Sequence, residues 1–581
     1  MNDRGALSAT LLRLALPLPY LFLLWAAYSV FAETVDDPYI TFRYAAHLLS
    51  GHGPVFNLGE RVEGYTSPLH LLLSAILLTT APSVDILFKA KCASLLFAVI
   101  ILAQTRTLAR RSGLGAWEAL LAQVLVALNI NFALASVNAL ETTLYGGVLL
   151  AGLLVFQREG RTGRGSLSGL LFFLAVLARP EALLVGAALL LVRLAWARRR
   201  NLPHTFVLHW LGLFLAPLCA VEAARWGYYG QLLPNTYFAK AQSLRNSLTF
   251  GQAYPLRAMS PTPTALSTFE VHLSLLNRSN MLALNSLVQK NIRFDAFNML
   301  MQILFWGLAF VGFWRTKRRI SGVIRVAVVA AAFLFVFKSG GDWMYGWRFM
   351  VPVLPLLAVG QCYGVRVLSR VLVRRWRTLS WATVRHCGAA VVTVLWLVAC
   401  AKTNHYSWKS VGFSTQGSRL LEASEGYGPL WVKGADYIRQ LPSGTRVAYS
   451  EMGYAGYTNM DKRLLDIRGL TDQEIAHLPA AYKYSTGITD KDWYRPGDPL
   501  GKILQSRKPD VIISFDRAPA ESALGSYRHR ATVVLPVNST QSAVQAYVFN
   551  RIDWLCCINP NHAINGTANG RGRRKPTASR G

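Results

Sequence analysis

Charged side chains are scarce in this chain, and acidic ones are scarcer than basic ones. Only 16% of the 581 residues are charged, and 30 Asp and Glu stand against 61 Lys and Arg, which gives a net charge of +31. Nucleic-acid-binding proteins usually become basic by carrying many charged residues, whereas 52% of this chain is hydrophobic. The composition therefore argues against a nucleic-acid-binding protein and indicates a membrane protein.

Several motifs of cofactor and metal sites are also missing. The sequence has no P-loop, no GxGxxG that follows a strand and opens a helix, no HExxH and no clear group of metal ligands. Its seven cysteines include no CxxC pair, and five of them lie in apolar runs, where they are predicted to be small core residues. These absences imply no particular cofactor and leave a divalent metal open.

What the chain does have is a series of long apolar runs before its C-terminal third. A further apolar stretch, residues 66–81, is predicted to lie at the outer membrane surface, because counting it as a span would reverse the side of every later loop. The remaining runs predict about eleven transmembrane helices, at residues 14–32, 88–108, 117–135, 140–157, 166–178, 181–197, 204–223, 296–314, 320–337, 347–368 and 387–402.

Basic residues gather in short loops between these runs. The positive-inside rule assigns such loops to the cytoplasm, and an odd number of spans then leaves the C-terminus on the outer side. The clusters are Arg106 with Arg110 and Arg111, Arg158 with Arg161 and Arg164, Arg193 with residues 198–200, Arg315 with residues 317–319, and Arg366 through Arg377.

The sequence therefore predicts a mainly α-helical polytopic membrane protein with a C-terminal soluble α/β domain. The predicted units are a transmembrane domain at 1–402 with outer loops at 33–87 and 225–295, an extracytoplasmic α/β domain at 403–565, and a basic disordered tail at 566–581.

The C-terminal region contains the expected secondary-structure signals. Thr471-x-x-Glu474 predicts a capping box that opens a short helix. Strand-like runs occur at 445–450, 511–515, 531–537 and 543–550.

Two adjacent carboxylates, Asp36 and Asp37, follow the first apolar run. Asp37 and Pro38 form a good N-cap and N1 pair, so a helix is predicted to begin there and to run to the turn at Gly51. One interpretation is that Asp37 only caps this helix and Asp36 is solvated. The other is that a carboxylate at this depth acts as a general base toward a sugar hydroxyl. The spacing alone leaves both open.

Other polar residues are predicted at the same outer face. The structural alternatives are that Glu141 stabilises a helix N-terminus and that Arg179 and Arg348 reach lipid headgroups. A lipid-phosphate substrate would sit at this level and needs Arg or Lys for its phosphate. Arg348 is the first candidate, since the Gly340-Gly341 turn precedes it, and Arg179 is the second. The full set of predicted substrate-binding residues is Arg43, Arg61, Glu141, Arg179, Glu181, Asn235, Lys240, Asp342 and Arg348.

The motifs together resemble a known family. The string DDPYITFRYAAHLLSGHGPVFNLGERVEGYTSPL is followed in order by LETTLY, ARPEALL, LLPNTYFAKA, GGDWMYGWRFMVPVLP and LLDIRGLTDQEIA. This pattern resembles the polyprenyl-phosphate-dependent membrane glycosyltransferases of the GT-C class, and most of all the branch of terminal arabinofuranosyltransferases of mycobacterial and corynebacterial cell walls. The resemblance implies that Asp36 is the catalytic base and Asp37 its partner.

The resemblance also implies an activity and a location. We expect a glycosyltransferase that moves a sugar, D-arabinofuranose, from a polyprenyl-phosphate donor to an envelope glycan or glycoprotein acceptor. The expected location is the outer face of a bacterial inner membrane, among lipids and without nucleic acid. One alternative is a lipid-linked sugar flippase or transporter, which predicts ionisable groups near the middle of the membrane. The other is a non-enzymatic, glycan-binding envelope assembly protein, which would not need Asp36.

Overall fold

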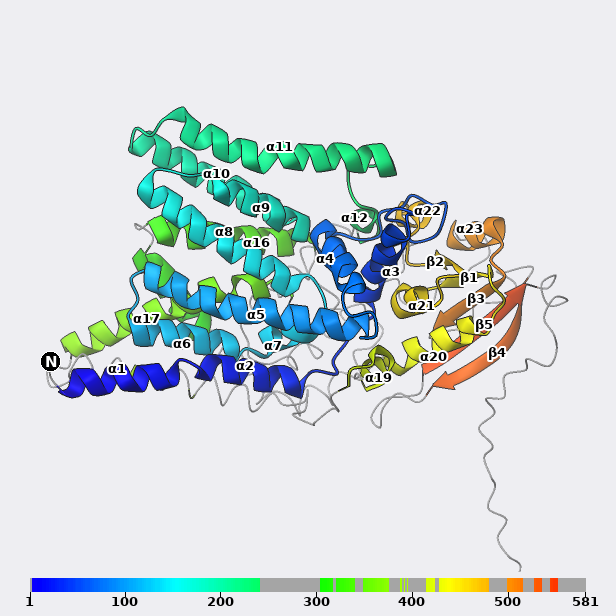
Figure 1. The fold of residues 1–581 in the computed structure, drawn as a ribbon, viewed down its shortest axis with the longest axis horizontal. Helices are drawn as coiled ribbons and strands as arrows, with labels where there is room; N and C mark the ends of the chain where they lie inside the picture. Colours follow the sequence, from blue (N-terminus) through cyan, green and yellow to red (C-terminus); the bar gives the residue numbers. More distant parts are fainter. Residues whose placement is uncertain are drawn as a thin grey trace, which may run out of the picture.

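A computed structural model shows a helical bundle joined to a smaller unit with a β-sheet (Figure 1). Of the predicted span at 387–402, only residues 387, 388, 391 and 394 are among the described residues. Asp342 lies outside them. The structure describes residues 3–240, 304–316, 320–339, 348–375, 387–388, 391, 394, 414–423, 428–479, 499–515, 527–535 and 544–551.

The bundle is built from apolar helices that run roughly side by side (Figure 1). Residues 304–316 are also helical. The other elements are α1 (Asp3–Ala15), α2 (Leu18–Ser29), α3 (Asp37–Leu49), α4 (Pro68–Thr79), α5 (Ile86–Arg111), α6 (Ala116–Ala127), α7 (Ile130–Val137), α8 (Thr142–Thr162), α9 (Leu167–Ala178), α10 (Ala182–Arg199), α11 (His204–Tyr229), α12 (Asn235–Ala239), α16 (Ile320–Ser339), the short 3₁₀ helix η1 (Val351–Val353) and α17 (Leu354–Arg375).

Four of the described helices are long and apolar enough to cross a membrane by length and composition, namely Ala9–Ser29, Ile86–Arg111, His204–Tyr229 and Val351–Val371. One predicted span, at 117–135, is instead divided into α6 and α7. The division falls where the Asn129 side chain accepts hydrogen bonds from the backbone N–H groups of Asn131 and Phe132. A side chain that caps a new helix at this point competes with continuation of the old one.

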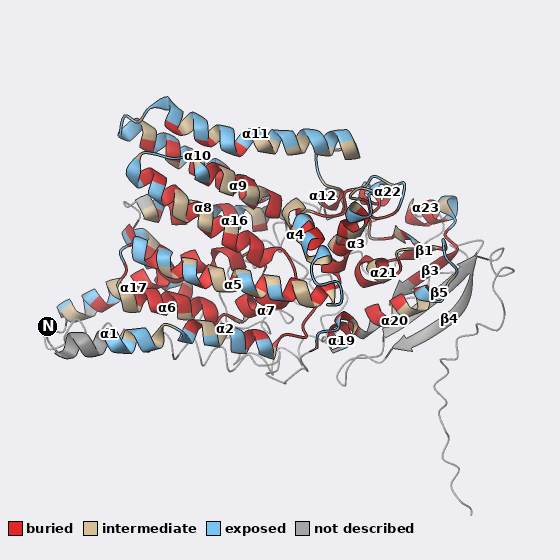
Figure 2. Ribbon diagram, in the orientation of Figure 1, coloured by how far each residue is buried: buried red, intermediate tan, exposed pale blue. Residues whose placement is uncertain are grey.

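The outer surface of the bundle carries exposed apolar side chains. Figure 2 shows that α11 is mostly exposed, whereas α6 and α7 are largely buried. Leu208, Leu213 and Trp226 of α11 are exposed although they are large and apolar. Such a surface is unfavourable in water and suits contact with lipid.

The basic loops meet at one end of the bundle. Arg161 donates to the backbone carbonyl of Arg111 at 2.5 Å, and Arg200 donates to that of Gly160 at 2.5 Å. Arg366 donates to the carbonyl of Gly113 at 3.0 Å. The helices then run to the opposite end, where α3, α4 and the sheet-containing unit lie (Figure 1).

The second unit contains a five-stranded sheet with strand order β2-β1-β3-β5-β4. Strands β1, β2 and β3 are parallel, and β5 is antiparallel to β3 and β4. Four strands overlap the predicted stretches, whereas β2 was not predicted. The elements are α19 (Gly417–Ala423), α20 (Gly428–Arg439), β1 (Arg446–Tyr449), α21 (Met452–Thr458), β2 (Arg463–Asp466), α22 (Gln473–Ala476), α23 (Pro499–Arg507), β3 (Val511–Phe515), β4 (Tyr527–Leu535) and β5 (Val544–Arg551).

The short helix predicted after Thr471 is present, but the predicted capping box of Thr471 and Glu474 is wrong. Helix α22 begins at Gln473, and the Asp472 carboxylate caps it by accepting the Ile475 N–H at 3.0 Å. Thr471 instead points to Asp466, which accepts its backbone N–H at 2.8 Å. Asp472 competes successfully because a carboxylate is a better acceptor at a helix N-terminus than a hydroxyl.

The loop after α3 fastens the two units together. The side-chain amide of Asn57 pairs with the backbone of strand β2, as a neighbouring strand would. Its Nδ2 donates to the carbonyl of Leu464 at 2.7 Å, and its Oδ1 accepts the N–H of Leu464 at 3.1 Å. Strand β2 is the edge strand, so this side chain satisfies groups that would otherwise be unpaired. Helix α21 packs directly on α3, which brings the C-terminal unit onto the acidic pair.

Candidate active site

Asp36 lies between α2 and α3, with its carboxylate buried against α21. Its Oδ2 accepts the backbone N–H of Gly453 at 2.6 Å, and its Oδ1 accepts that of Tyr454 at 2.7 Å. A Cβ at Gly453 would overlap the backbone carbonyl oxygen of Asp36, so only glycine allows this close approach. Burial, and secondly the nearby Glu451 carboxylate, raises the pKa of Asp36 to about 7 against the effect of the two donors.

Helix α3 begins close to the predicted place, but the prediction of Asp37 as its N-cap is wrong: Asp37 is the first helical residue, and its side chain makes no capping hydrogen bond. The residue at the N-cap position is Asp36, whose side chain does not cap either. The Asp37 side chain is 24% exposed, and its Oδ2 lies 3.9 Å from Nη1 of Arg348. Asp37 therefore faces a guanidinium and solvent, whereas Asp36 faces protein backbone.

Arg348 belongs to a buried cluster at the ends of several helices. Arg179, directly after α9, pairs with Glu141 before α8 and with Glu181 before α10. The ring of Phe349 lies 4.7 Å from the Arg179 guanidinium carbon and 5.4 Å from that of Arg348. Two carboxylates thus neutralise Arg179, and the ring stacks beside both arginines.

Lys91 supports the segment before the acidic pair, and the sequence analysis missed it. Its Nζ is buried in α5 and donates to the backbone carbonyls of Phe31 at 2.9 Å, Glu33 at 2.8 Å and Val137 at 2.7 Å. These bonds tie the end of α2 to α5 and α7. The missed signal was a lone lysine inside an apolar run, since ionisable residues in such runs are rare and have specific partners.

Two of the predicted substrate-binding residues are directed at backbone groups instead. The Arg43 guanidinium is buried and donates to the carbonyls of Phe56 at 2.7 Å, Asn459 at 3.2 Å and Lys462 at 3.0 Å, and also to that of Gly456. Asn235 donates through Nδ2 to the carbonyls of Gly469 at 2.8 Å and Leu470 at 3.0 Å. Both side chains hold the C-terminal unit in place.

The other predicted basic residues lie at the surface. Arg61 is exposed, and its guanidinium carbon lies 4.9 Å from the centre of the Tyr228 ring. Lys240 is exposed directly after α12. Among the described residues, no group of three or more His, Cys, Asp and Glu has the arrangement of a metal site.

A second buried pair fixes the first loop to α11. Arg225 Nε lies 2.8 Å from Oε2 of Glu63, and the backbone carbonyl of Glu63 accepts the N–H of Asn235 at 3.0 Å. Burial raises the pKa of Glu63 to about 7, although Arg225 opposes the shift. The first loop is therefore held on both sides, by α11 and by the sheet.

The chain is similar to proteins of known activity. It is 33% identical over 219 residues to the terminal β-(1→2)-arabinofuranosyltransferase of Mycobacterium tuberculosis, and 26% identical over 409 residues to the protein of the same name from Corynebacterium glutamicum. The matches cover 35% and 63% of this chain and 34% and 53% of those proteins, so the chain spans about a third to about half of their length. This similarity confirms the resemblance predicted from the sequence motifs.

Further comparisons concern the C-terminal unit and the fold. A family model described as a domain of unknown function (DUF8728) matches residues 423–551. The crystal structure of ArnT from Cupriavidus metallidurans bound to undecaprenyl phosphate gives a TM-score of 0.45 at 13% identity, covering 91% of this chain and 96% of that one. The apo structure gives 0.47 at 12% identity, covering 94% and 99%. Both TM-scores are below 0.5, so neither assigns a fold.

Proposed function

We propose that this protein is a membrane glycosyltransferase that transfers D-arabinofuranose from a polyprenyl-phosphate donor to an envelope glycan or glycoprotein. The observation that carries the proposal is the similarity to two terminal arabinofuranosyltransferases. A site with suitable chemistry supports it, because an accessible carboxylate lies beside an arginine where the helical bundle meets the C-terminal unit.

We assign the general base to Asp37. A base must come within about 2.6–3.2 Å of the hydroxyl that it deprotonates. Both oxygens of Asp36 already accept backbone hydrogen bonds, and the residue is only 4% exposed. Asp37 is more exposed and faces Arg348. Sequence resemblance alone favours Asp36, and its position instead supports a role in positioning α21 beside the site.

The proposed reaction is a displacement at the anomeric carbon of the donor sugar. The acceptor hydroxyl gives its proton to Asp37, its oxygen forms the new glycosidic bond, and the bond between the anomeric carbon and the phosphate oxygen breaks. Polyprenyl phosphate leaves with that electron pair, and Arg348 stabilises the negative charge that develops on it. No acid is needed, since phosphate is a good leaving group.

The proposed location is the outer face of a bacterial inner membrane. The basic loops meet at the end of the bundle far from the acidic pair (Figure 1), and the positive-inside rule assigns that end to the cytoplasm. The active site and the C-terminal unit would then be extracytoplasmic. A lipid-linked donor fits this side, because it carries its own activated sugar.

The test is transfer by the purified full-length chain. The protein, in nanodiscs, receives a synthetic polyprenyl-phosphoryl arabinofuranose and an arabinan oligosaccharide, and mass spectrometry follows the acceptor. The expected product is the oligosaccharide extended by one pentose. Movement of the donor across a sealed membrane without any extended acceptor would instead indicate a flippase, and neither result with an active reference transferase would reject the proposal.

A further inference from the structure

The carboxyl ends of the parallel strands β1 and β2 lie side by side, and a charged residue follows each of them. Tyr449 and Asp466, the last residues of the two strands, are register partners. Glu451 comes two residues after the first, and Arg468 comes two residues after the second. The two strands therefore bring a carboxylate and a guanidinium to the same edge of the sheet.

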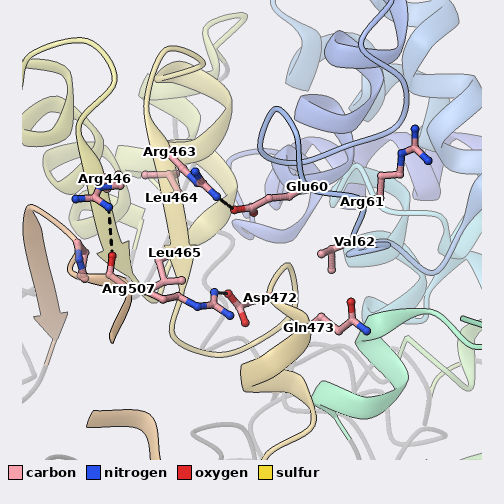
Figure 3. Close-up of a pocket in the computed structure, with 11 residues that line it drawn as sticks. Glu60, Arg61, Val62, Arg446, Arg463, Leu464, Leu465, Asp472, Gln473 and Arg507 are labelled. Carbon is pink, nitrogen blue, oxygen red and sulfur yellow. Dashed lines mark hydrogen bonds and ion pairs between the residues drawn. The ribbon is translucent and has the colours of Figure 1, made fainter. Parts of the chain in front are cut away.

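This edge has the topology of a ligand site. The strand order β2-β1-β3 means that the chain leaves β1 for a strand on one side and later returns to a strand on its other side. In open parallel sheets, ligands bind outside the carboxyl ends of the strands at such a point. The cavity in Figure 3 lies at the opposite edge, by the first residues of β1 and β2, where Glu60 and Asp472 already pair with arginines.

The Glu451 carboxylate has one oxygen left for a ligand. Its Oε1 accepts Nη2 of Arg468 at 2.5 Å and the hydroxyl of Ser450 at 3.4 Å. Its Oε2 has no hydrogen-bond partner among the residues that the structure describes, and the side chain makes no capping hydrogen bond to α21. The side chain is 17% exposed, so a ligand hydroxyl can reach this carboxylate and donate to it.

Arg468 holds the Glu451 carboxylate in place. The backbone N–H of Arg468 donates to Oδ1 of Asp466 at 2.8 Å. Asp466 is buried and also accepts the N–H of Thr471 at 2.8 Å. The turn after β2 is therefore fixed at both ends, and it carries the guanidinium that binds Oε1 of Glu451.

Glu451 is also a neighbour of the acidic pair. It directly precedes α21, whose first turn donates two backbone N–H groups to the Asp36 carboxylate. The two carboxylates are close enough for Glu451 to contribute to the raised pKa of Asp36. Asp37 is the next residue of the chain and faces Arg348. The C-terminal unit thus brings a carboxylate to the proposed site from the side opposite to the bundle.

We propose that Glu451 binds a hydroxyl group of the acceptor glycan and that Arg468 is its positioning residue. This inference rests on the proposed transferase function. The lipid donor reaches the site along the bundle, whose outer surface carries exposed apolar side chains. A glycan is water-soluble and reaches the site from the C-terminal unit. Its attacking hydroxyl lies at Asp37, and another hydroxyl of the same glycan donates to Glu451.

The test varies donor and acceptor separately in the pentose-transfer assay. Glu451→Gln keeps the size of the side chain and an oxygen for Arg468, but it replaces one carboxylate oxygen by an amide group. We expect the Michaelis constant for the arabinan oligosaccharide to rise about tenfold or more, the usual scale for a lost hydrogen bond to a charged group. The Michaelis constant for the lipid donor and the midpoint of thermal unfolding should stay at their wild-type values.

Glu474→Gln is the matched control. Glu474 is a glutamate of the same unit that is also paired with an arginine, Arg507, and its loss should leave both Michaelis constants unchanged. Arg468→Gln should raise the acceptor constant, and Arg468→Lys should restore it in part, because lysine keeps the charge without the planar geometry of guanidinium. A lower unfolding midpoint in Arg468→Gln with an unchanged acceptor constant would remove the positioning role.

Binding of the oligosaccharide is measured separately, by isothermal titration without donor to the full-length chain in nanodiscs. We expect saturable binding to wild type and a dissociation constant that is about tenfold or more higher in Glu451→Gln. This arm does not depend on transfer. A chain that transfers no pentose but loses oligosaccharide binding in Glu451→Gln would lose the proposed function and keep the glycan site.

Three results would overturn the inference. One is the absence of saturable oligosaccharide binding to wild type. Another is an equal acceptor affinity in wild type and Glu451→Gln, which in a chain that transfers pentose removes this inference alone. The third is a lower turnover number in Glu451→Gln with both Michaelis constants unchanged, because that pattern indicates an interaction made only in the transition state.

Discussion

The Asp37 carboxylate lies 3.9 Å from the Arg348 guanidinium, at the junction of α3 with the turn before η1. This relationship matters for the proposed reaction, because the base acts on the acceptor hydroxyl and the cation acts on the phosphate of the donor. The anomeric carbon is bonded directly to a phosphate oxygen, so the attacking hydroxyl and the leaving phosphate are both close to it. The pair therefore defines a site whose two halves can be tested separately.

Asp37→Asn should abolish most transfer while leaving the fold intact. Loss of a general base usually lowers the rate by about two to four orders of magnitude, and Asp37 makes no capping hydrogen bond whose loss would destabilise α3. The measurements are the turnover number in the pentose-transfer assay and the midpoint of thermal unfolding. Asp436→Asn removes an exposed, ion-paired aspartate outside the site and should change neither.

The opposite pattern would return the base to Asp36. In that case Asp37→Asn would retain wild-type turnover, and Asp36→Asn would lose it at an unchanged unfolding midpoint. The pH profile gives a further distinction, since a base with a pKa of about 7 makes the rate rise with pH through that value.

Asp36 should make stability depend on pH. Its pKa is about 7 in the folded protein against an ordinary value of 3.8, so the folded state binds this proton more tightly than the unfolded state does. The contribution of Asp36 to the free energy of unfolding therefore falls as the pH rises from about 4 to about 7 and is constant above that. Thermal unfolding at about pH 5 and about pH 8 should show a smaller decrease in Asp36→Asn than in wild type.

The alanine variant at the same position separates titration from hydrogen bonding. Asp36→Ala leaves the N–H groups of Gly453 and Tyr454 without their acceptor, at about 1–3 kcal/mol for each buried donor. It should therefore unfold at a lower temperature than Asp36→Asn at every pH. Equal pH dependence in wild type and Asp36→Asn would show that other groups, such as the buried Glu63, account for it.

Helices and strands were predictable where one signal dominates. The start of α3 follows from Asp37-Pro38, and four strands follow from runs of branched and aromatic residues. The division of the predicted span at Asn129 was missed because hydropathy ignores capping. Strand β2 was missed because it is only four residues long, Arg463–Asp466, and both of its end residues are charged.

Partners of the site residues were less predictable than their positions. The order of motifs places Asp37, Glu141, Arg179 and Arg348 at one end of the bundle. In the structure all four are joined there, by two ion pairs and by the ring of Phe349 between the two arginines. Nothing local in the sequence shows that Asp36 turns to α21 or that Arg43 binds carbonyls beyond residue 450. Such contacts depend on how the C-terminal unit docks, which is a property of tertiary packing.

Arg43→Met should loosen the C-terminal unit. Its guanidinium donates to four backbone carbonyls and is buried, and methionine keeps most of the apolar stem but no donor. The loss of several buried charge-assisted bonds is expected to cost about 3 kcal/mol or more in total. Limited proteolysis between the units should become faster, whereas Arg439→Met, at an exposed arginine, should match wild type. Equal cleavage of all three would contradict the role given to Arg43.

Sidedness can be tested by labelling single cysteines in intact cells. The chain has seven native cysteines, so the background is a variant in which they are replaced by serine or alanine. A membrane-impermeant maleimide should label Cys at exposed Lys433 in α20 and should label Cys at Arg161 only after lysis. The reverse pattern would put the basic loops outside and the acidic pair on the cytoplasmic side, which removes the proposed location.

Arg348 and Arg179 should respond differently to mutation, although both stack on Phe349. Arg179 pairs with Glu141 and Glu181, and all three side chains are buried, so Arg179→Ala leaves two buried carboxylates and should cost about 3–5 kcal/mol of stability.

Arg348 faces Asp37, which is partly exposed, so Arg348→Ala should mainly raise the Michaelis constant for the lipid donor and lower turnover, with little effect on the acceptor. Arg348→Lys should restore activity only in part, because an ammonium group lacks the two-pronged geometry of guanidinium toward phosphate. Steady-state kinetics with donor and acceptor varied separately, beside thermal unfolding, measures both effects. Wild-type donor kinetics in both Arg348 variants would exclude Arg348 as the phosphate ligand and leave Lys240 as the next basic residue to test.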